Sequence, residues 1–352
     1  MSFEEIISLV SEENREMIYE VMAHPVLVEA ALEIPIDMEF PNTDKVVFTG
    51  IGTSGLTGEF MKTYFENVGL PIQFRVYRSQ DVPIDNESLY IVYSYSGTTL
   101  ETLQSLMKVH KHGIKPYVIS TGGYLELYAR KHNLPFVKIK IPEIENVRKL
   151  ETRSHLPFGV TFFARIFSEI FNVKEQVERD LKEALEVLKK LLDNIGKMKD
   201  FLTTTTKKIA ESTLPVILAD NAISPVARRF RNQLCENAKK ISMWDVFPEM
   251  GHNLLCALKE EAERALLIVY KRNSADEITK KYYEILDVMF AQNNIIYINI
   301  CDEKYSWGTL LEPVFISDIL SILVGDYLGR KTKPIRQVDI VKEKLKEVVS
   351  LP

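Results

Sequence analysis

Residues 89–99 read LYIVYSYSGTT, and residues 45–55 read KVVFTGIGTSG. Each stretch begins with a run rich in β-branched and aromatic residues, which predicts a buried strand of a parallel sheet. Each then passes into glycine and hydroxyl residues, after which the hydrophobic spacing becomes helical. Because ligands bind where parallel strands end and helices begin, these two junctions predict a binding edge in an α/β domain.

The same alternation of strands and helices extends over most of the chain. Further strands are expected at 72–77, 115–120, 136–141, 214–219, 265–270 and 294–300. A charged stretch with helical spacing runs from Val160 to Lys208 and separates two similar halves. The predicted fold class is therefore α/β, with two doubly wound parallel-sheet lobes, three layers each, joined by a helical linker and followed by a C-terminal helix.

The chain has 352 residues, which suits two domains better than one. The domain boundaries that we expect are an N-terminal helical segment at 1–43, a first lobe at 44–160, a helical connection at 161–210, a second lobe at 211–330 and a C-terminal helix at 331–352.

Composition excludes several classes of protein. The net charge is −5, so a general nucleic-acid binder with a basic face is not expected. Three cysteines with neither CxxC nor zinc spacing predict reduced thiols and no metal site. The N-terminus is acidic and amphipathic, unlike a signal peptide, and we expect no apolar run that approaches the roughly 18 residues of a membrane helix. A cytoplasmic protein without membrane or nucleic-acid partners is expected.

The two junctions carry the groups that a phosphate needs. The candidate ligands are Gly52, Thr53 and Ser54 in the first loop, and Ser94, Ser96, Thr98 and Thr99 in the second. Glycine lets the backbone approach an anion, and the first N–H groups of a helix point at it. The first loop alone is equally well interpreted as a capped tight turn. The second has four hydroxyls within six residues, more than one helix cap requires, which favours a phosphate cradle.

Two nucleotide-binding alternatives fit the junctions less well. GIGTSG lacks the third glycine of a dinucleotide fingerprint, and no acidic residue closes a second strand about 20 residues later. The sequence also has no GKS or GKT, so a nucleotide P-loop is not expected.

The stretch SYSGTTLETL, which starts at Ser94, closely resembles the phosphosugar loop of SIS (sugar isomerase) domains. The chain is most similar to the bifunctional phosphoglucose/phosphomannose isomerase family. GIGTSG, the turn at Gly122-Gly123, Arg153 with Phe158-Gly159, RRFRNQLCENAK and PEMGHN resemble further motifs of that family, in family order. The resemblance implies a cofactor-free isomerase that interconverts glucose 6-phosphate, and mannose 6-phosphate, with fructose 6-phosphate through a cis-enediolate.

The resemblance also assigns catalytic roles. Glu236 in NQLCENAKK corresponds to the base that moves a proton between C1 and C2, although a lone glutamate is usually a solvated helix residue. His252 in PEMGHN corresponds to the acid/base of ring opening, although a histidine there would otherwise be interpreted as a helix cap. Arg153 corresponds to the group that stabilises the enediolate. It follows Thr152 here, whereas the family has proline at that position.

The C-terminal segment matches the family less closely. Lys342 is the best counterpart of a family lysine that reaches the substrate. Lys331, Thr332 and Lys333 are more basic than the family pattern, and the family threonine associated with accepting the C2 epimer has no certain counterpart. Mannose 6-phosphate activity is therefore expected less firmly than glucose 6-phosphate activity.

The resemblance further implies a homodimer in which His252 of one subunit serves the site of the other. Two alternatives to the isomerase remain open. One is a related amino-sugar-phosphate deaminase or isomerase. The other is a non-catalytic phosphosugar-binding module, which would keep the two loops but would have no reason to retain Arg153, Glu236 and His252 together.

Overall fold

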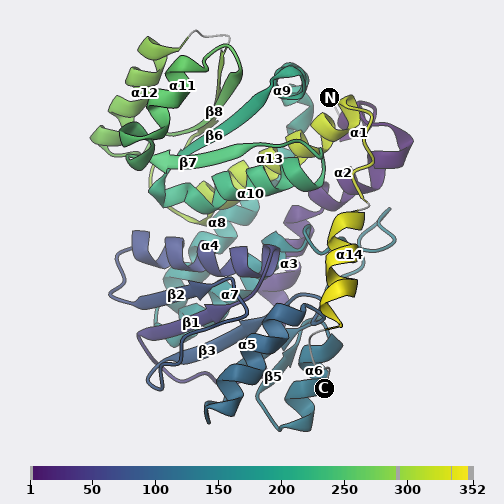
Figure 1. The fold of residues 1–352 in the computed structure, drawn as a ribbon, viewed down its shortest axis with the longest axis vertical. Helices are drawn as coiled ribbons and strands as arrows, with labels where there is room; N and C mark the ends of the chain where they lie inside the picture. Colours follow the sequence, from purple (N-terminus) through teal and green to yellow (C-terminus); the bar gives the residue numbers. More distant parts are fainter. Residues whose placement is uncertain (1–2, 291–293, 334, 348–352) are drawn as a thin grey trace. The chain divides into compact units, whose positions relative to one another are not determined.

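The computed structural model describes residues 3–290, 294–333 and 335–347. The chain divides into two compact units, each with one sheet. The first lobe comprises His24–Arg179 and Ile335–Pro352, and the second lobe comprises Met1–Ala23 and Asp180–Pro334, within the described residues. The expected fold class is confirmed, because both sheets are parallel and helices cover them (Figure 1).

The first lobe is built on a five-stranded parallel sheet with the order β2-β1-β3-β4-β5. Its strands are β1 (Lys45–Thr49), β2 (Gln73–Tyr77), β3 (Leu89–Tyr93), β4 (Tyr117–Ser120) and β5 (Phe136–Lys138). β3 is buried along its whole length, as expected of a central strand covered on both faces. β1 and β3 are neighbours with strands on either side, so the loops that follow them leave the sheet side by side.

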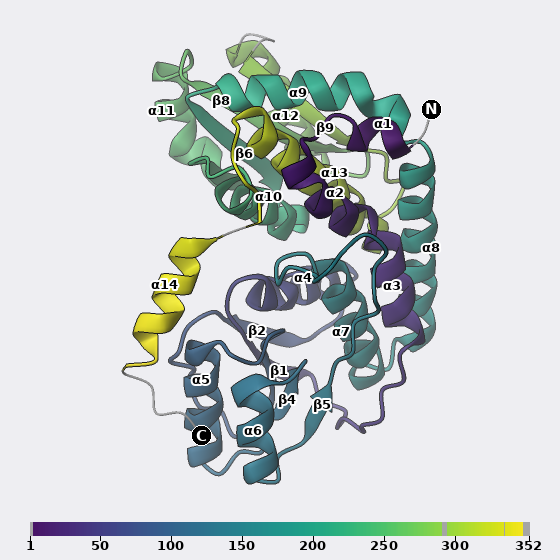
Figure 2. The same ribbon diagram turned by 90° about the vertical axis from the view of Figure 1, so that its right-hand side faces the viewer.

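Helices cover both faces of this sheet. Its helices are α3 (His24–Glu33), α4 (Thr53–Asn67), α5 (Leu100–Lys111), α6 (Gly123–Lys131), α7 (Leu156–Ile170) and α14 (Arg336–Leu345). α4 and α7 pack together on one face, and α5 and α6 cover the other (Figure 2). This doubly wound arrangement places the start of α4 and the start of α5 at the same edge of the sheet.

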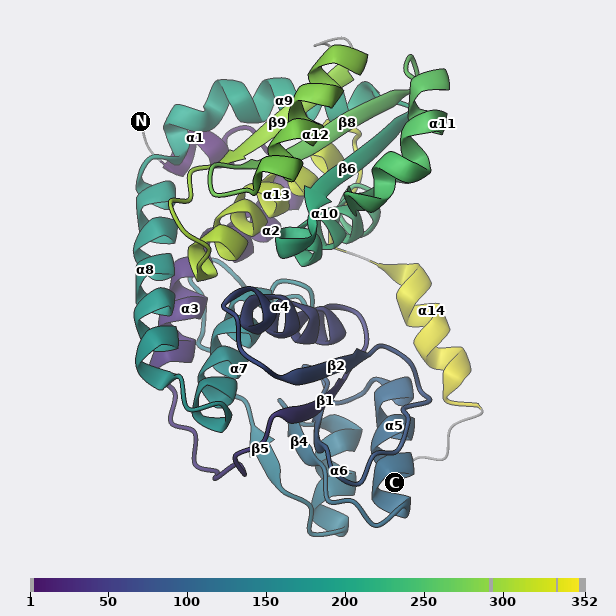
Figure 3. The same ribbon diagram turned by 90° about the vertical axis from the view of Figure 1, so that its left-hand side faces the viewer.

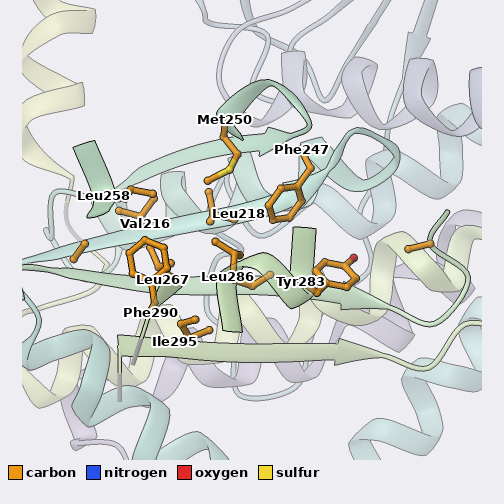
Figure 4. Close-up of a cluster of buried hydrophobic side chains, with 13 residues drawn as sticks. Val216, Leu218, Phe247, Met250, Leu258, Leu267, Tyr283, Leu286, Phe290 and Ile295 are labelled. Carbon is orange, nitrogen blue, oxygen red and sulfur yellow. The ribbon is translucent and has the colours of Figure 1, made fainter. Parts of the chain in front are cut away.

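The second lobe has a four-stranded parallel sheet with the order β7-β6-β8-β9. Its strands are β6 (Leu214–Asp220), β7 (Met243–Phe247), β8 (Ala265–Arg272) and β9 (Ile295–Ile300). Alternate residues of the central strands, such as Val216 and Leu218 of β6, join a cluster with Leu286 and Phe290 (Figure 4). The cluster fixes one face of the sheet against its covering helices.

The other elements of this lobe surround the sheet (Figure 3). They are α1 (Phe3–Ile7), η1 (Glu12–Asn14), α2 (Arg15–Met22), η2 (Ile195–Met198), α9 (Lys199–Glu211), η3 (Asn221–Ile223), α10 (Ser224–Glu236), η4 (Glu249–His252), α11 (Leu254–Glu260), α12 (Glu277–Met289) and α13 (Trp307–Tyr327). α8 (Lys174–Asp193) carries the chain into this unit. α10, α9 and α2 all pack on α13, which is the central helix of the lobe.

The sequence patterns do not predict α13, β7 or α11. α13 is apolar on every side and therefore lacks the one-sided spacing that reveals a surface helix. By length and composition, α13 could also cross a membrane. The expectation that the chain has no such segment is therefore wrong on these two criteria. Most of the helix is buried inside the lobe, which is typical of a core helix.

At the C-terminus the expected helix is present as α14, which ends at Leu345. The expected segment 331–352 also includes residue 334 and residues 348–352, which lie outside the described residues.

A buried ion pair fixes α10 to α13. Arg229 Nε and Nη2 donate to the two carboxylate oxygens of Asp318 at 3.0 and 2.8 Å, and both side chains are 1% exposed. Nearby, Asn237 Nδ2 donates to Ser321 Oγ at 2.9 Å. These bonds hold the end of α10 against the central helix.

We predict that Arg229→Ala lowers the free energy of unfolding by about 3–5 kcal/mol, because it leaves the Asp318 carboxylate buried without its partner. Arg231→Ala is the matched control on the same helix, since Arg231 is exposed, and it should change stability by less than about 0.5 kcal/mol. Urea unfolding of both variants measures the difference. Equal losses would show that the pair does not hold α10.

Candidate functional site

The two glycine and hydroxyl loops meet at the carboxyl edge of the first sheet. The first runs from the end of β1 into α4, and Gly52 at the N-cap of α4 has a φ of +61°. The second runs from the end of β3 into α5, with Thr99 at the N-cap. The first N–H groups of both helices have no partner within their helix, so this edge offers several backbone donors.

The hydroxyls of these loops divide into two groups. Ser54 and Ser94 are buried and have structural bonds: the Tyr95 N–H donates to Ser54 Oγ at 3.0 Å and so joins the two loops, and Ser94 Oγ donates to Thr99 Oγ1 at 3.1 Å within the second loop. Thr98 is exposed, and its hydroxyl lies 2.9 Å from that of the half-buried Ser96. Thr53 at the start of α4 is also half-buried. The accessible hydroxyls are therefore those of Thr53, Ser96, Thr98 and Thr99.

A third turn closes on the second loop with almost no space between the backbones. Gly97 has a φ of +66°, and a Cβ added there would lie 1.7 Å from the Gly122 carbonyl oxygen. A Cβ on Gly123 would lie 2.7 Å from the Ser96 carbonyl oxygen. Ser120 Oγ donates to the Gly122 carbonyl at 2.8 Å and fixes its direction. Only glycine fits at these positions, so the second loop and the turn before α6 form one rigid unit.

Arg153 lies in a segment that packs against the second loop. The ring of His155, at the N-cap of α7, stacks on Tyr95 with centroids 4.1 Å apart and planes 9° from parallel. Arg153 is 1% exposed, and its Nη1 donates to Glu151 Oε2 at 3.0 Å. The structure therefore brings the segment that carries Arg153 to the same sheet edge as the two loops.

Arg78 is a residue of this edge that the sequence patterns did not single out. It follows β2, and its Nη2 donates to the Gly52 carbonyl oxygen at 3.3 Å, while its Nη1 pairs with Glu59 at 3.0 Å. These bonds support the backbone of the first loop. The sequence signal that could have identified Arg78 was a cationic residue directly after a predicted strand, beside the glycine loop.

Glu236 and His252 lie in the second lobe. Glu236 is the last residue of α10 and is half-buried, and α10 leads to the amino end of β7. His252 is exposed and ends η4, which follows the carboxyl end of β7. Because β6 and β7 are parallel, α10 runs back along the sheet, and the two residues belong to opposite ends of β7. The helix cap in this turn is Asn253, whose side chain accepts from the Leu254 N–H, and not His252.

Lys342, the expected counterpart of the family lysine, and Thr332, which belongs to the basic stretch before it, have different surroundings. Lys342 is half-buried on α14, and Leu345 of the same helix packs on the core of the first lobe. Thr332 is fully buried in the second lobe, and its hydroxyl donates to Asn14 Oδ1 at 2.9 Å. The Thr332 hydroxyl is thus engaged inside its own lobe.

The carboxyl edge of the second sheet contains a buried ion network in place of a glycine loop. Arg272 at the end of β8 donates to Asp220 at 2.8 Å and to Asp302 at 3.2 Å, and all three are buried. Ser274 Oγ donates to Asp302 at 2.5 Å. Burial, together with the nearby Asp302 carboxylate, raises the pKa of Glu312 to about 7. This buried network has two carboxylates for one guanidinium, so it does not favour an anion, whereas the first lobe offers backbone donors at its sheet edge.

Within the described ranges, no group of three His, Cys, Asp or Glu side chains is arranged to hold a metal ion.

Comparisons with known proteins agree with this geometry. Residues 39–140 match the SIS domain model, and residues 202–345 match the model of the bacterial phospho-glucose isomerase C-terminal SIS domain. The chain carries two SIS domains. The resemblance to the bifunctional phosphoglucose/phosphomannose isomerases is confirmed: the relative from Caldicellulosiruptor bescii is 26% identical over 336 residues, which cover 91% of this chain and 95% of the relative.

A second relative bears a different name. The D-glucosamine-6-phosphate 4-epimerase of Sulfolobus acidocaldarius is 25% identical and covers 86% of this chain and 89% of its own. Among solved structures, the glucosamine-6-phosphate deaminase of Thermotoga maritima superposes with a TM-score of 0.61 at 16% identity, covering 91% of this chain and 97% of its own. This last similarity shows that the two chains share a fold.

The contact between Gly97 and Gly122 predicts the effect of adding one methyl group. Gly97→Ala should displace the second loop and abolish binding of inorganic phosphate, because the new Cβ would overlap the Gly122 carbonyl. Gly113→Ala is the matched control: Gly113 has a φ of +84° but open space around its Cβ position. It should cost only about 1–2 kcal/mol of backbone strain and keep phosphate binding. Phosphate titration and urea unfolding compare the two, and equal behaviour would contradict this account of the loop.

Glu312 predicts a pH dependence of stability. Its pKa is higher in the folded chain than the ordinary 4.5, so folding favours the protonated form. The wild type should therefore lose stability as pH rises from about 4.5 to 7. Glu312→Gln, which stays neutral, should be more stable than wild type above pH 7 by up to about 3 kcal/mol and equal to it below pH 4. Thermal unfolding between pH 4 and 8 tests this, with exposed Glu260→Gln as control. A pH-independent difference would contradict it.

Proposed function

We propose that this protein is an aldose–ketose isomerase that interconverts glucose 6-phosphate, and also mannose 6-phosphate, with fructose 6-phosphate. The observation that carries the proposal is the joined pair of glycine and hydroxyl loops at the first sheet edge, with the segment of Arg153 packed against them. The bifunctional isomerases among the relatives, and the C-terminal domain model, support the same assignment.

The first lobe binds the phosphate in this proposal. Ser96, Thr98 and Thr99, together with Thr53, offer accessible hydroxyls beside the N–H groups at the starts of α4 and α5. Ser54 joins the two loops and Ser94 braces the second loop internally, and the backbone at Gly52 approaches the anion closely. Hydroxyls and N–H groups bind a dianion without placing a fixed positive charge beside it, so product release is not hindered by an ion pair.

The isomerisation itself needs a base, a stabilising charge and a means of opening the sugar ring. In our proposal Glu236 removes the proton from C2 of the open-chain aldose and returns it to C1, and the pair of electrons passes through a cis-enediolate. Arg153 stabilises the negative charge of that intermediate. His252 moves a proton between the ring oxygen and O1 when the ring opens. Lys342 contacts the substrate, and the reaction uses no cofactor and no metal ion.

The topology of the second lobe supports a site shared between subunits. Glu236 and His252 belong to opposite ends of β7, so one second lobe does not offer both to a single reacting centre. A homodimer in which His252 reaches the partner's site satisfies both roles, and two-fold symmetry then creates two equal sites. We propose that this dimer is cytoplasmic. We also propose that residues 44–160 and 211–330 are the two SIS domains of each subunit.

One observation favours a second candidate function. The glucosamine-6-phosphate epimerase matches almost as much of the chain, at nearly the same identity, as the bifunctional isomerase does. An amino-sugar-phosphate epimerase would use the same phosphate edge on a different carbon of the sugar. Glucosamine 6-phosphate is therefore the comparison substrate in the first test below.

The first test measures turnover directly. The purified protein should convert fructose 6-phosphate to glucose 6-phosphate without added NAD or ammonia, and it should leave glucosamine 6-phosphate unchanged. Glu236→Gln should retain its fold and phosphate binding but lose at least about a hundredfold in kcat, the usual contribution of a positioned base. Epimerisation of glucosamine 6-phosphate without isomerisation would favour the second candidate, and near-normal turnover in Glu236→Gln would remove that residue from the mechanism.

The second test asks whether sites are shared. His252→Ala and Glu236→Gln are each expected to be inactive, but a heterodimer of the two would contain one intact site. After demonstrated subunit exchange, the mixture should recover up to about a quarter of wild-type activity, because half of the dimers are then heterodimers with one of two sites intact. Homodimers of each variant, incubated alone, are the controls. An exchanged mixture that stays inactive would mean that His252 acts within its own chain or not at all.

A further inference from the structure

The turn that follows the helix ending at Glu236 contains a lysine in the left-handed conformation that glycine usually adopts. Lys239 has a φ of +48°, and the N–H of Lys240 donates to the Leu234 carbonyl at 3.0 Å, which closes the turn back onto the end of the helix. A side chain in this left-handed conformation is strained, and glycine avoids the strain. A strained residue close to a proposed catalytic group suggests that its side chain has a specific task.

The ammonium group of Lys239 shows what that task is. Its Nζ donates to the Glu236 carbonyl at 2.9 Å, to the Lys331 carbonyl at 2.6 Å and to the Thr332 carbonyl at 3.1 Å. An ammonium has three N–H donors, and each of them has one carbonyl partner here. One side chain thus joins the residue proposed as the base to the segment at 331–332.

That segment is itself firmly held within the second lobe. The N–H and hydroxyl of Thr332 donate to Asn14 Oδ1 at 2.8 and 2.9 Å. Arg330 Nη1 donates to the Ala238 carbonyl at 2.6 Å, and Asn14 Nδ2 donates to the Arg330 carbonyl at 3.0 Å. Lys239 therefore links Glu236 to a segment that is itself hydrogen-bonded to the residue at the start of α2.

We infer that Lys239 is a positioning residue for the isomerisation: it fixes the backbone of Glu236 so that the carboxylate stands at the reacting carbons. The inference rests on the proposed role of Glu236 as the base. A displacement of about 1 Å at a catalytic group can lower the rate about a hundredfold. A backbone that is fixed at this position therefore keeps kcat high. Lys239 acts through Glu236, and it needs no contact with the sugar.

The adjacent lysine provides a matched control. Lys240 Nζ also donates to two carbonyls, those of Ala210 and Ser212, at 3.2 and 2.7 Å. These bonds tie the same turn to the end of α9, on a side that does not include Glu236. Lys240→Met removes a comparable set of bonds without releasing the Glu236 carbonyl.

The test compares Lys239→Met, Lys239→Gly and Lys240→Met, with fructose 6-phosphate as substrate. Both Lys239 variants should lose at least about tenfold in kcat with KM changed less than twofold, whereas Lys240→Met should keep kcat within about twofold. Lys239→Gly relieves the backbone strain, so it should stay folded, and its melting temperature separates lost positioning from lost stability. Equal kcat values for the Lys239 and Lys240 variants would overturn the inference.

Double variants separate this inference from the proposed function. Adding Lys239→Gly to Glu236→Gln should cause no further loss of kcat, because the residue that Lys239 positions has already lost its chemistry. A further tenfold loss in that background would show that Lys239 acts independently of Glu236 and would overturn the inference. Wild-type turnover in Glu236→Gln alone would instead remove the base assignment, and the positioning role would fall with it.

Discussion

The close approach of the Gly97 backbone to the Gly122 carbonyl is the contact on which the binding edge depends. It brings the second loop and the turn before α6 together, and it leaves no room for any side chain at residue 97. The bond from the Tyr95 N–H to Ser54 Oγ extends the same unit to the first loop, and the stack of Tyr95 on His155 extends it to the segment of Arg153. The groups that we assign to phosphate and enediolate therefore have a common rigid support.

The second lobe uses the same fold for a different purpose. Its sheet edge is filled by the buried Arg272 network, in which two carboxylates, those of Asp220 and Asp302, surround one guanidinium. What it contributes to the proposed chemistry comes from both ends of β7. The end of α10 is held by the Arg229–Asp318 pair and by Lys239, while the turn of His252 is exposed. Both features fit the proposal of a site shared between two subunits.

Much of this architecture could be predicted from the sequence, because buried parallel strands and glycine junctions leave local signals. β1, β3 and the loops after them follow directly from KVVFTGIGTSG and LYIVYSYSGTT. α13 was missed because a helix that is apolar on all sides has no periodicity. β7 was missed because MWDVF is short, lies at the sheet edge and mixes polar with apolar residues. The structural roles of Ser54 and Ser94 could not be predicted either, because the sequence of a loop does not distinguish a buried serine from a ligand-binding serine.

Contacts between distant segments left no signal at all. The bonds from Lys239 to residues 331 and 332, and from Thr332 to Asn14, join positions more than 90 and 300 residues apart. Neither hydrophobic spacing nor turn chemistry reports such pairs. The positioning of Glu236 could therefore be inferred only from the folded chain, whereas its candidacy as a base came from the motif around it.

The central claim is that this protein moves a proton between C1 and C2 of a sugar phosphate. It is tested most directly by incubating the wild-type enzyme with fructose 6-phosphate in deuterium oxide and following the aldose product by nuclear magnetic resonance. A base that exchanges its proton with solvent should place deuterium at C2 of the glucose 6-phosphate formed, and Glu236→Gln should form neither the aldose nor the label. Unchanged fructose 6-phosphate under conditions in which glucosamine 6-phosphate is epimerised would contradict the account.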